Sequence, residues 1–164
     1  MRIIHLKGTQ FAIPTWYRIW HKPTYKEFSA TFDERAIYVQ SDVNEQADWL
    51  KLVGISFSIN AMHESVMVSW RWNEEKQVFQ FGAYFHVDKG VNKSEPLFEL
   101  PRTGGTFTFS IGIDYDDKKY TVFLPRVSKS KTFTHDKSWA RSINPYASGT
   151  LNMPKTICFD LNYL

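Results

Sequence analysis

Hydrophobic and polar residues alternate along most of this chain. The pattern is clearest over 65–87, where every second residue is apolar: Val66, Val68, Trp70, Trp72, then Phe79, Phe81, Ala83, Phe85 and Val87. A period of two is typical of a β-strand with one buried face. We therefore predict two strands joined as a hairpin, with these residues in the core.

Similar patterns recur in other segments, which we also predict to be strands. They are 4–6, 28–32, 36–40, 52–59, 107–113, 120–124 and 157–163. The only helical turn that we predict is 45–50, with Asn44 as its cap. Several short strands separated by turn residues favour an all-β fold, an antiparallel β-sandwich or jelly roll, in a single domain over 1–164.

The segment 127–153 is rich in Ser, Thr, Lys and Asn, and lacks sustained alternation. We predict a long ordered loop here. Long loops without regular structure of their own are usually functional or disordered. Two of its aromatic residues, Trp139 and Tyr146, are candidate partner-contact residues, since aromatic side chains dominate the energetics of protein interfaces.

The register of the 65–87 hairpin follows from its apolar residues. A one-residue slip would turn every side chain to the other face, so the register that keeps one face apolar should prevail. That condition requires a connecting loop of even length and places Trp70 opposite Phe79. The pairs predicted on the second face are Arg71–Val78, Ser69–Gln80, Met67–Gly82, Ser65–Tyr84 and His63–His86.

This second face is a polar strip with small residues at its centre. Its candidate ligand-binding residues are Arg71, Gln80, Tyr84, His86, Ser69 and His63. Three interpretations remain open: an ordinary solvated or covered sheet face, a carbohydrate or protein-contact surface, and a catalytic cleft. Jelly-roll polysaccharide lyases place Gln, His, Arg and Tyr on such a face, where a tyrosine can act as general acid or base. Because no run of lyase motifs is present, we assign no catalytic residue.

The composition agrees with a strand-rich chain. Among 164 residues there are 13 Phe, 8 Tyr and 6 Trp, which are types that strands favour. The net charge of +3 is scattered apart from a mild cluster within 118–131. Nucleic-acid binding would require a denser basic stripe, so we do not expect a nucleic-acid partner.

Other chemistry is sparse. Cys158 is the only cysteine and is predicted to be a partly buried thiol without a disulfide. His63 and His86 lack a third metal ligand, and the aspartates of the 114–119 turn are typical of hairpin turns. We therefore predict no metal and no cofactor. We also expect no signal peptide and no membrane span.

Several short motifs occur together between Lys51 and Pro154. They contain Lys51, Leu52, Gly54, His63, Ser65, Trp70, Arg71, Tyr84 and Gly90, followed by Pro145, Tyr146, Gly149 and Pro154. In this combination the chain resembles a family of small uncharacterised β-sandwich proteins from Bacteroidetes bacteria and their phages. The family's histidine run is reduced here to His63, and Lys155 replaces a histidine. The resemblance implies a fold and a biological setting, and it implies no reaction.

From these features we expect a non-enzymatic β-sandwich that binds or assembles, most simply as a structural component of a tailed-phage virion. Its partners would be proteins in an oligomeric assembly, located in the virion or the host cytoplasm. The alternative is a jelly-roll protein that binds a glycan or resembles a polysaccharide lyase.

Overall fold

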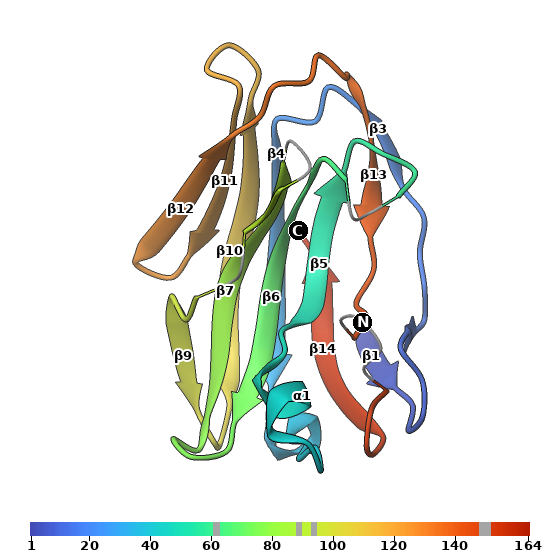
Figure 1. Cartoon of the computed structure of the whole chain (residues 1–164), viewed down its shortest axis with the longest axis vertical. Coiled ribbons are helices and arrows are strands. Elements are labelled where there is room, and N and C mark those ends of the chain that lie inside the picture. Colours follow the sequence, from blue (N-terminus) through green and yellow to red (C-terminus); the bar gives the residue numbers. More distant parts are fainter. Residues whose placement is uncertain (61–62, 88–89, 93–94, 148–151) are drawn as a thin grey trace.

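The structure is a computed structural model that describes residues 1–60, 63–87, 90–92, 95–147 and 152–164. Two antiparallel sheets face each other, with β5, β6 and β7 in front of β4 in Figure 1. The predicted antiparallel β-sandwich is therefore confirmed. Among the described residues, no helix is long and apolar enough to cross a membrane.

The strands of the rear sheet, called sheet A here, are given in their spatial order. They are β12 (Val127–Thr132), β11 (Lys119–Leu124), β10 (Gly105–Asp114), β4 (Tyr25–Phe32), β14 (Ile157–Tyr163), β1 (Arg2–His5) and β2 (Ala12–Ile13).

The front sheet is called sheet B. Its order is β3 (Ile19–His21), β13 (Trp139–Ile143), β5 (Leu50–Ser56), β6 (Ser65–Asn73), β7 (Val78–Val87) and β8 (Gly90–Asn92), while β9 (Phe98–Pro101) also pairs with β7. The helical elements are a 3-10 turn, η1 (Glu34–Ala36), and α1 (Val43–Ala47).

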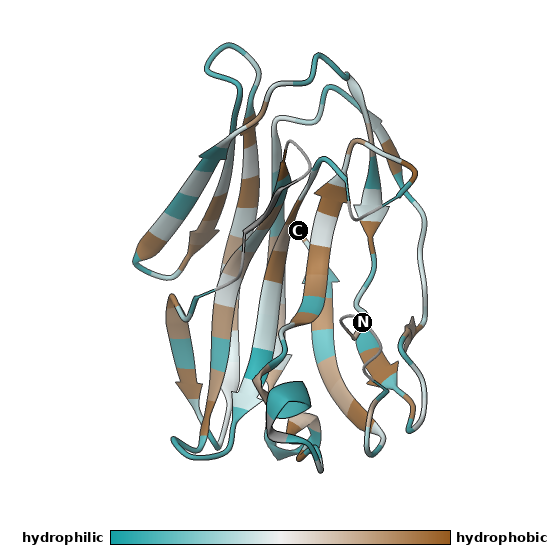
Figure 2. Ribbon diagram, in the orientation of Figure 1, coloured by the Kyte–Doolittle hydropathy of each residue, from teal (hydrophilic) through white to brown (hydrophobic). Residues whose placement is uncertain are grey.

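The core lies between the two sheets and is dominated by aromatic rings. Trp70 of β6 is 1% exposed, and its ring centroid lies 4.8 Å from that of Phe32 and 5.6 Å from that of Phe159, both in sheet A. The predicted apolar set of the hairpin is buried: Val66, Val68, Trp70, Phe79, Phe81 and Phe85. In Figure 2 many strands show alternating brown and pale or teal bands, as expected for strands with one buried face.

The loop between β6 and β7 has an even number of residues, as predicted. Four residues, 74–77, connect the strands, and Trp70 pairs with Phe81 rather than with Phe79. The predicted pairs are therefore wrong by two residues, although each residue lies on its predicted face. The turn decides the difference, because the Asn73 side chain accepts a hydrogen bond from the Lys76 amide and Gln77 adopts a positive φ.

The predicted long loop over 127–153 is wrong, because it contains β12 and β13. Strand β12 was missed since it forms an edge of sheet A and consists mainly of Ser, Lys and Thr. The buried residues of β13 are Ala140, Ser142 and Ile143. Because the first two are small, the alternation of hydrophobic and polar residues in β13 is weak.

Three local predictions also require correction. The predicted strand 36–40 is absent, because Asp33 caps the 3-10 turn η1. The strand predicted over 52–59 ends at Ser56. The Ser56 hydroxyl donates to the Ser58 carbonyl oxygen and accepts a hydrogen bond from the Ser58 amide, which forms a turn. Ile59, beyond this turn, is 95% exposed. The helix predicted at 45–50 spans Val43–Ala47, with Asp42 rather than Asn44 as its cap.

Candidate functional site

The outer face of sheet B, which points away from the core, is built from rows of residues paired across neighbouring strands. The rows are Lys51–Ser69–Gly82, Gly54–Met67–Tyr84, Arg141–Ser56–Ser65–His86 and Arg71–Gln80–Glu99. Five of the predicted strip residues therefore share one face: Ser69, Arg71, Gln80, Tyr84 and His86. His63 does not, because it lies exposed in the turn before β6, and Ser65 pairs with His86 instead.

A β-bulge brings Lys51 to this face. The register of β5 against β6 shifts between Lys51 and Val53, so that one residue, Leu52, has no pairing partner. A regular strand would have placed Lys51 on the same face as the buried Val53 and Ile55. The bulge instead pairs Lys51 with Ser69 and directs its side chain away from the core.

Small residues form the floor of the site. A side chain at Gly54 would clash with Met67 and with the Val66 carbonyl oxygen, at 2.3 and 2.5 Å from a Cβ atom. Ser69 lies on the floor too, and its hydroxyl donates to the Gly82 carbonyl. Ser69 and Gln80 are both buried, so this part of the polar strip is covered.

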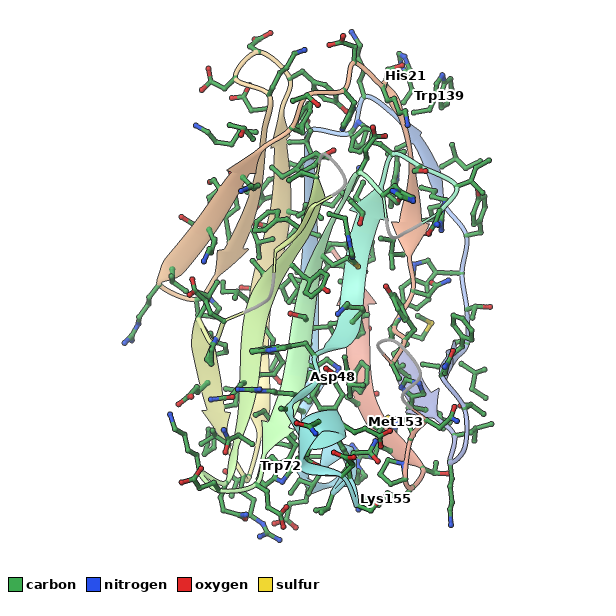
Figure 3. The ribbon with its side chains drawn as sticks, in the orientation of Figure 1. His21, Asp48, Trp72, Trp139, Met153 and Lys155 are labelled. Carbon is green, nitrogen blue, oxygen red and sulfur yellow. The ribbon has the colours of Figure 1, made fainter. Side chains whose placement is uncertain are left out.

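Lys51 is a buried amine without a carboxylate partner among the described residues. Its Nζ donates to the Trp49 carbonyl oxygen at 2.9 Å and lies 3.6 Å from the Tyr84 ring centroid, two strands away. Only 2% of the residue is exposed, and burial lowers the pKa of Lys51 to about 7, partly opposed by the charge of Asp48. Asp48 lies between α1 and β5, and Figure 3 shows it close to α1.

His86 is the second buried polar group of the site. It is 2% exposed, and neither ring nitrogen has a hydrogen-bond partner among the described residues. Burial, together with the charges of Lys51 and His63, lowers the pKa of His86 to about 4. The ring is therefore neutral at pH 7 and can offer one donor and one acceptor to a ligand.

Two tyrosines enclose these groups. The Tyr84 ring centroid lies 5.0 Å from that of His86, and burial raises the pKa of Tyr84. Tyr146 joins the site from the segment after β13 by backbone hydrogen bonds in both directions with Lys51, and burial raises its pKa to about 12. Both hydroxyls are thus protonated at neutral pH. We call Lys51, Tyr84, His86 and Tyr146 the central cluster.

Arg71 and Gln80, by contrast, have their polar groups engaged. The Arg71 guanidinium donates to Gln80 Oε1 at 2.8 Å and to the Ala47 carbonyl at 2.7 Å, and it lies 4.7 Å from the Trp49 ring centroid. Gln80 Nε2 donates to Glu99 at 2.7 Å. Arg71 and Gln80 therefore hold one end of the face together by their hydrogen bonds. The Lys51 amine and the His86 ring nitrogens, by contrast, can still form hydrogen bonds with a ligand.

The candidate partner-contact residues differ in exposure. Trp139 on β13 is 63% exposed, with its ring centroid 4.9 Å from that of His21 on β3, and Figure 3 shows both at one end of the molecule. Tyr146 is half-buried in the central cluster. Partner contact by these two residues stays a prediction. Cys158 is half-buried, and no group of three or more metal-ligating side chains occurs among the described residues.

Neither protein-family models nor curated proteins match this sequence. Solved structures do match its fold. An alginate lyase from Pseudomonas aeruginosa is 12% identical, with a TM-score of 0.54, over 86% of this chain and 64% of its own. An alginate lyase from an Alteromonas species is 10% identical, with a TM-score of 0.52, over 99% of this chain and 93% of its own. The fold is a jelly-roll β-sandwich.

The chain spans somewhat less than two thirds of the Pseudomonas lyase and nearly all of the Alteromonas lyase. At such identities the likeness describes the fold alone, and no residue role is transferred from either enzyme. The role of the central cluster must therefore be argued from its own geometry. Sequence reasoning missed Lys51, although a lysine within the otherwise apolar run 50–55 was a signal.

Proposed function

We propose that this chain is a carbohydrate-binding jelly-roll protein whose ligand is an acidic glycan held at the central cluster. One observation carries the proposal: Lys51 and His86 are both buried, and neither meets a carboxylate among the described residues. Buried ionisable groups are normally paired, and those that are not paired gather at functional sites.

A ligand carboxylate would complete this arrangement. It would form an ion pair with the Lys51 ammonium, and it would accept a hydrogen bond from the neutral His86 ring. Tyr84 and Tyr146 are half-buried and therefore reach the surface, where their rings offer flat apolar contact and their hydroxyls offer polar contact. Sugar rings carry both kinds of surface. The likeness in fold to two alginate lyases supports an acidic sugar.

The proposal predicts selective binding of alginate oligosaccharides over neutral glucan oligosaccharides of the same length. Isothermal titration calorimetry at pH 6 should show heat only with the acidic ligand. Lys51→Met should weaken this binding at least about tenfold, because a charge-assisted hydrogen bond is lost. Wild-type affinity should fall as the pH rises above about 7, where Lys51 loses its proton.

The matched control is Lys155→Met, which removes an exposed lysine elsewhere on the molecule and should leave the affinity unchanged. Equal binding of acidic and neutral oligosaccharides would contradict the proposal. Release of an unsaturated product, followed by ultraviolet absorbance, would extend the proposed function from binding to lyase activity.

We also propose, as a second function, a structural part in an oligomeric assembly such as a tailed-phage virion. The supporting observation is an exposed apolar group at the edge of sheet A, formed by Leu6, Phe11 and Ile13 beside β2. Apolar groups on an exposed edge are typical of protein contacts. Sedimentation velocity should show an oligomer that Ile13→Ser weakens, and a monomer at high micromolar concentration would contradict this second function.

A further inference from the structure

A recess lies on the outer face of sheet B, at the end formed by β3 and β13. It has a volume of about 220 Å³ and is lined by Tyr17, Ile19, Ser58, Ile59, Trp139 and Arg141, among others. We call it the aromatic hollow. Neither the central cluster nor the edge at β2 contributes to its lining.

Two aromatic rings of the hollow are open to solvent. Trp139 and Tyr17 are 63% and 67% exposed, and Ile19 and Ile59 are exposed beside them. Single exposed apolar residues are common on proteins, whereas a cluster around a recess indicates a contact surface. The hollow therefore offers stacking surface to a ligand.

The lining is not purely apolar. The Arg141 guanidinium donates to the Ser58 carbonyl at 3.1 Å and to the Ile59 carbonyl at 2.5 Å, which holds the turn after β5 against β13. Aromatic faces beside a few convergent polar groups suit a ligand that has an apolar face and a polar rim. A sugar ring has both, because its C–H groups and its hydroxyls point in different directions.

The hollow and the central cluster belong to one continuous face. Arg141 pairs with Ser56, Ser56 with Ser65, and Ser65 with His86. Neighbouring strands lie about 4.8 Å apart, so three strand spacings separate Arg141 from His86 by roughly 14 Å. Only two serines of the sheet stand between them, and no large side chain of this row divides the face.

We propose that the aromatic hollow is a second subsite of this face, and that it receives a sugar ring of an acidic oligosaccharide whose carboxylate is held by the central cluster. The inference rests on the proposed carbohydrate-binding function. It adds that the ligand is an oligomer lying across the strands from β7 to β3. A disaccharide reaches one subsite only, whereas a longer chain reaches both.

Calorimetry with two probes tests this inference: a uronic acid disaccharide and the hexasaccharide of the same series. Wild type should bind the hexasaccharide at least about tenfold more tightly, since aromatic anchors typically contribute this much. In the double variant Tyr17→Ala, Trp139→Ala the hexasaccharide should bind only as tightly as the disaccharide. The disaccharide affinity should change less than about twofold, because the central cluster is intact.

The matched control is Tyr25→Ala, which removes a tyrosine of similar exposure, 52%, from sheet A. It should leave both affinities unchanged, and a loss as large as that of the double variant would overturn the inference. If the double variant keeps full hexasaccharide affinity while Lys51→Met abolishes it, the hollow is no subsite but the proposed function stands.

Two further outcomes would overturn the inference. If wild type binds neither probe, both the proposed function and the second subsite are overturned. If the double variant dissociates an oligomer of the chain in sedimentation velocity and leaves hexasaccharide affinity unchanged, the hollow is a protein contact and the inference is overturned.

Discussion

Trp70→Ala should lower the free energy of unfolding by about 3–5 kcal/mol, the cost of removing a large aromatic side chain from a packed core. The Trp70 indole is one of the contacts between the two sheets, since it touches Phe32 and Phe159 of sheet A, and it also touches Tyr38 after η1. Because the core is close-packed, the surrounding structure should close the resulting cavity only in part. Chemical denaturation followed by circular dichroism measures the loss.

Trp139→Ala provides the comparison, because it removes the same residue type from an exposed position on sheet B. Surface substitutions away from special features usually change stability by no more than about 0.5 kcal/mol. A similar loss in both variants would show that Trp70 is not the core residue that its burial indicates.

Lys51→Met should stabilise the protein, and the gain should depend on pH. The pKa of Lys51 is lowered from 10.5 to about 7, so the folded state resists a charge that the unfolded chain carries. This penalty is complete below about pH 7 and disappears as the pH approaches 10.5. The lowering of the pKa from 10.5 to about 7 corresponds to a penalty on the order of 5 kcal/mol.

The expected result is a variant that is several kcal/mol more stable than wild type at pH 6. The difference should shrink by about 1.4 kcal/mol per pH unit between pH 7 and 9, below the range where tyrosines titrate. Denaturant unfolding at pH 6, 7, 8 and 9 tests both points. Lys155→Met, at an exposed site, should show no such slope, and a pH-independent difference for Lys51→Met would contradict the assignment.

These outcomes connect stability with function. Lys51→Met is expected to stabilise the folded chain and to weaken binding of the acidic ligand. Such a trade-off between stability and function is usual where a binding site holds an unfavourable buried charge. A ligand carboxylate would raise the pKa of Lys51 by pairing with it. Wild type should therefore recover part of its lost stability when the acidic oligosaccharide is added.

Local alternation was enough to predict which side each residue of the central hairpin faces. The side chains of Trp70 and Phe81 lie in the core, and those of Arg71 and Tyr84 lie on the opposite face, as the period of two requires. The sequence alone therefore determined the sandwich and most of the polar face. It did so because the side-chain period of a strand is a property of the local backbone.

Other features were decided by turn geometry and by contacts between distant segments. The Asn73 turn set the pairing two residues away from the predicted one, and β12 and β13 formed strands because neighbouring strands supplied their hydrogen bonds. Neither effect leaves a strong local pattern. Strand partners and turn geometry depend on which backbone groups remain to be satisfied after folding.

The central cluster is the clearest case. A bulge in β5 turns Lys51 away from the core, and the chain brings it to Tyr84 across β6 and to Tyr146 from beyond β13. By sequence parity alone, Lys51 belongs with Val53 and Ile55 on the buried face. Only the tertiary structure could place its amine at this site, because burial and charge depend on which segments surround a residue.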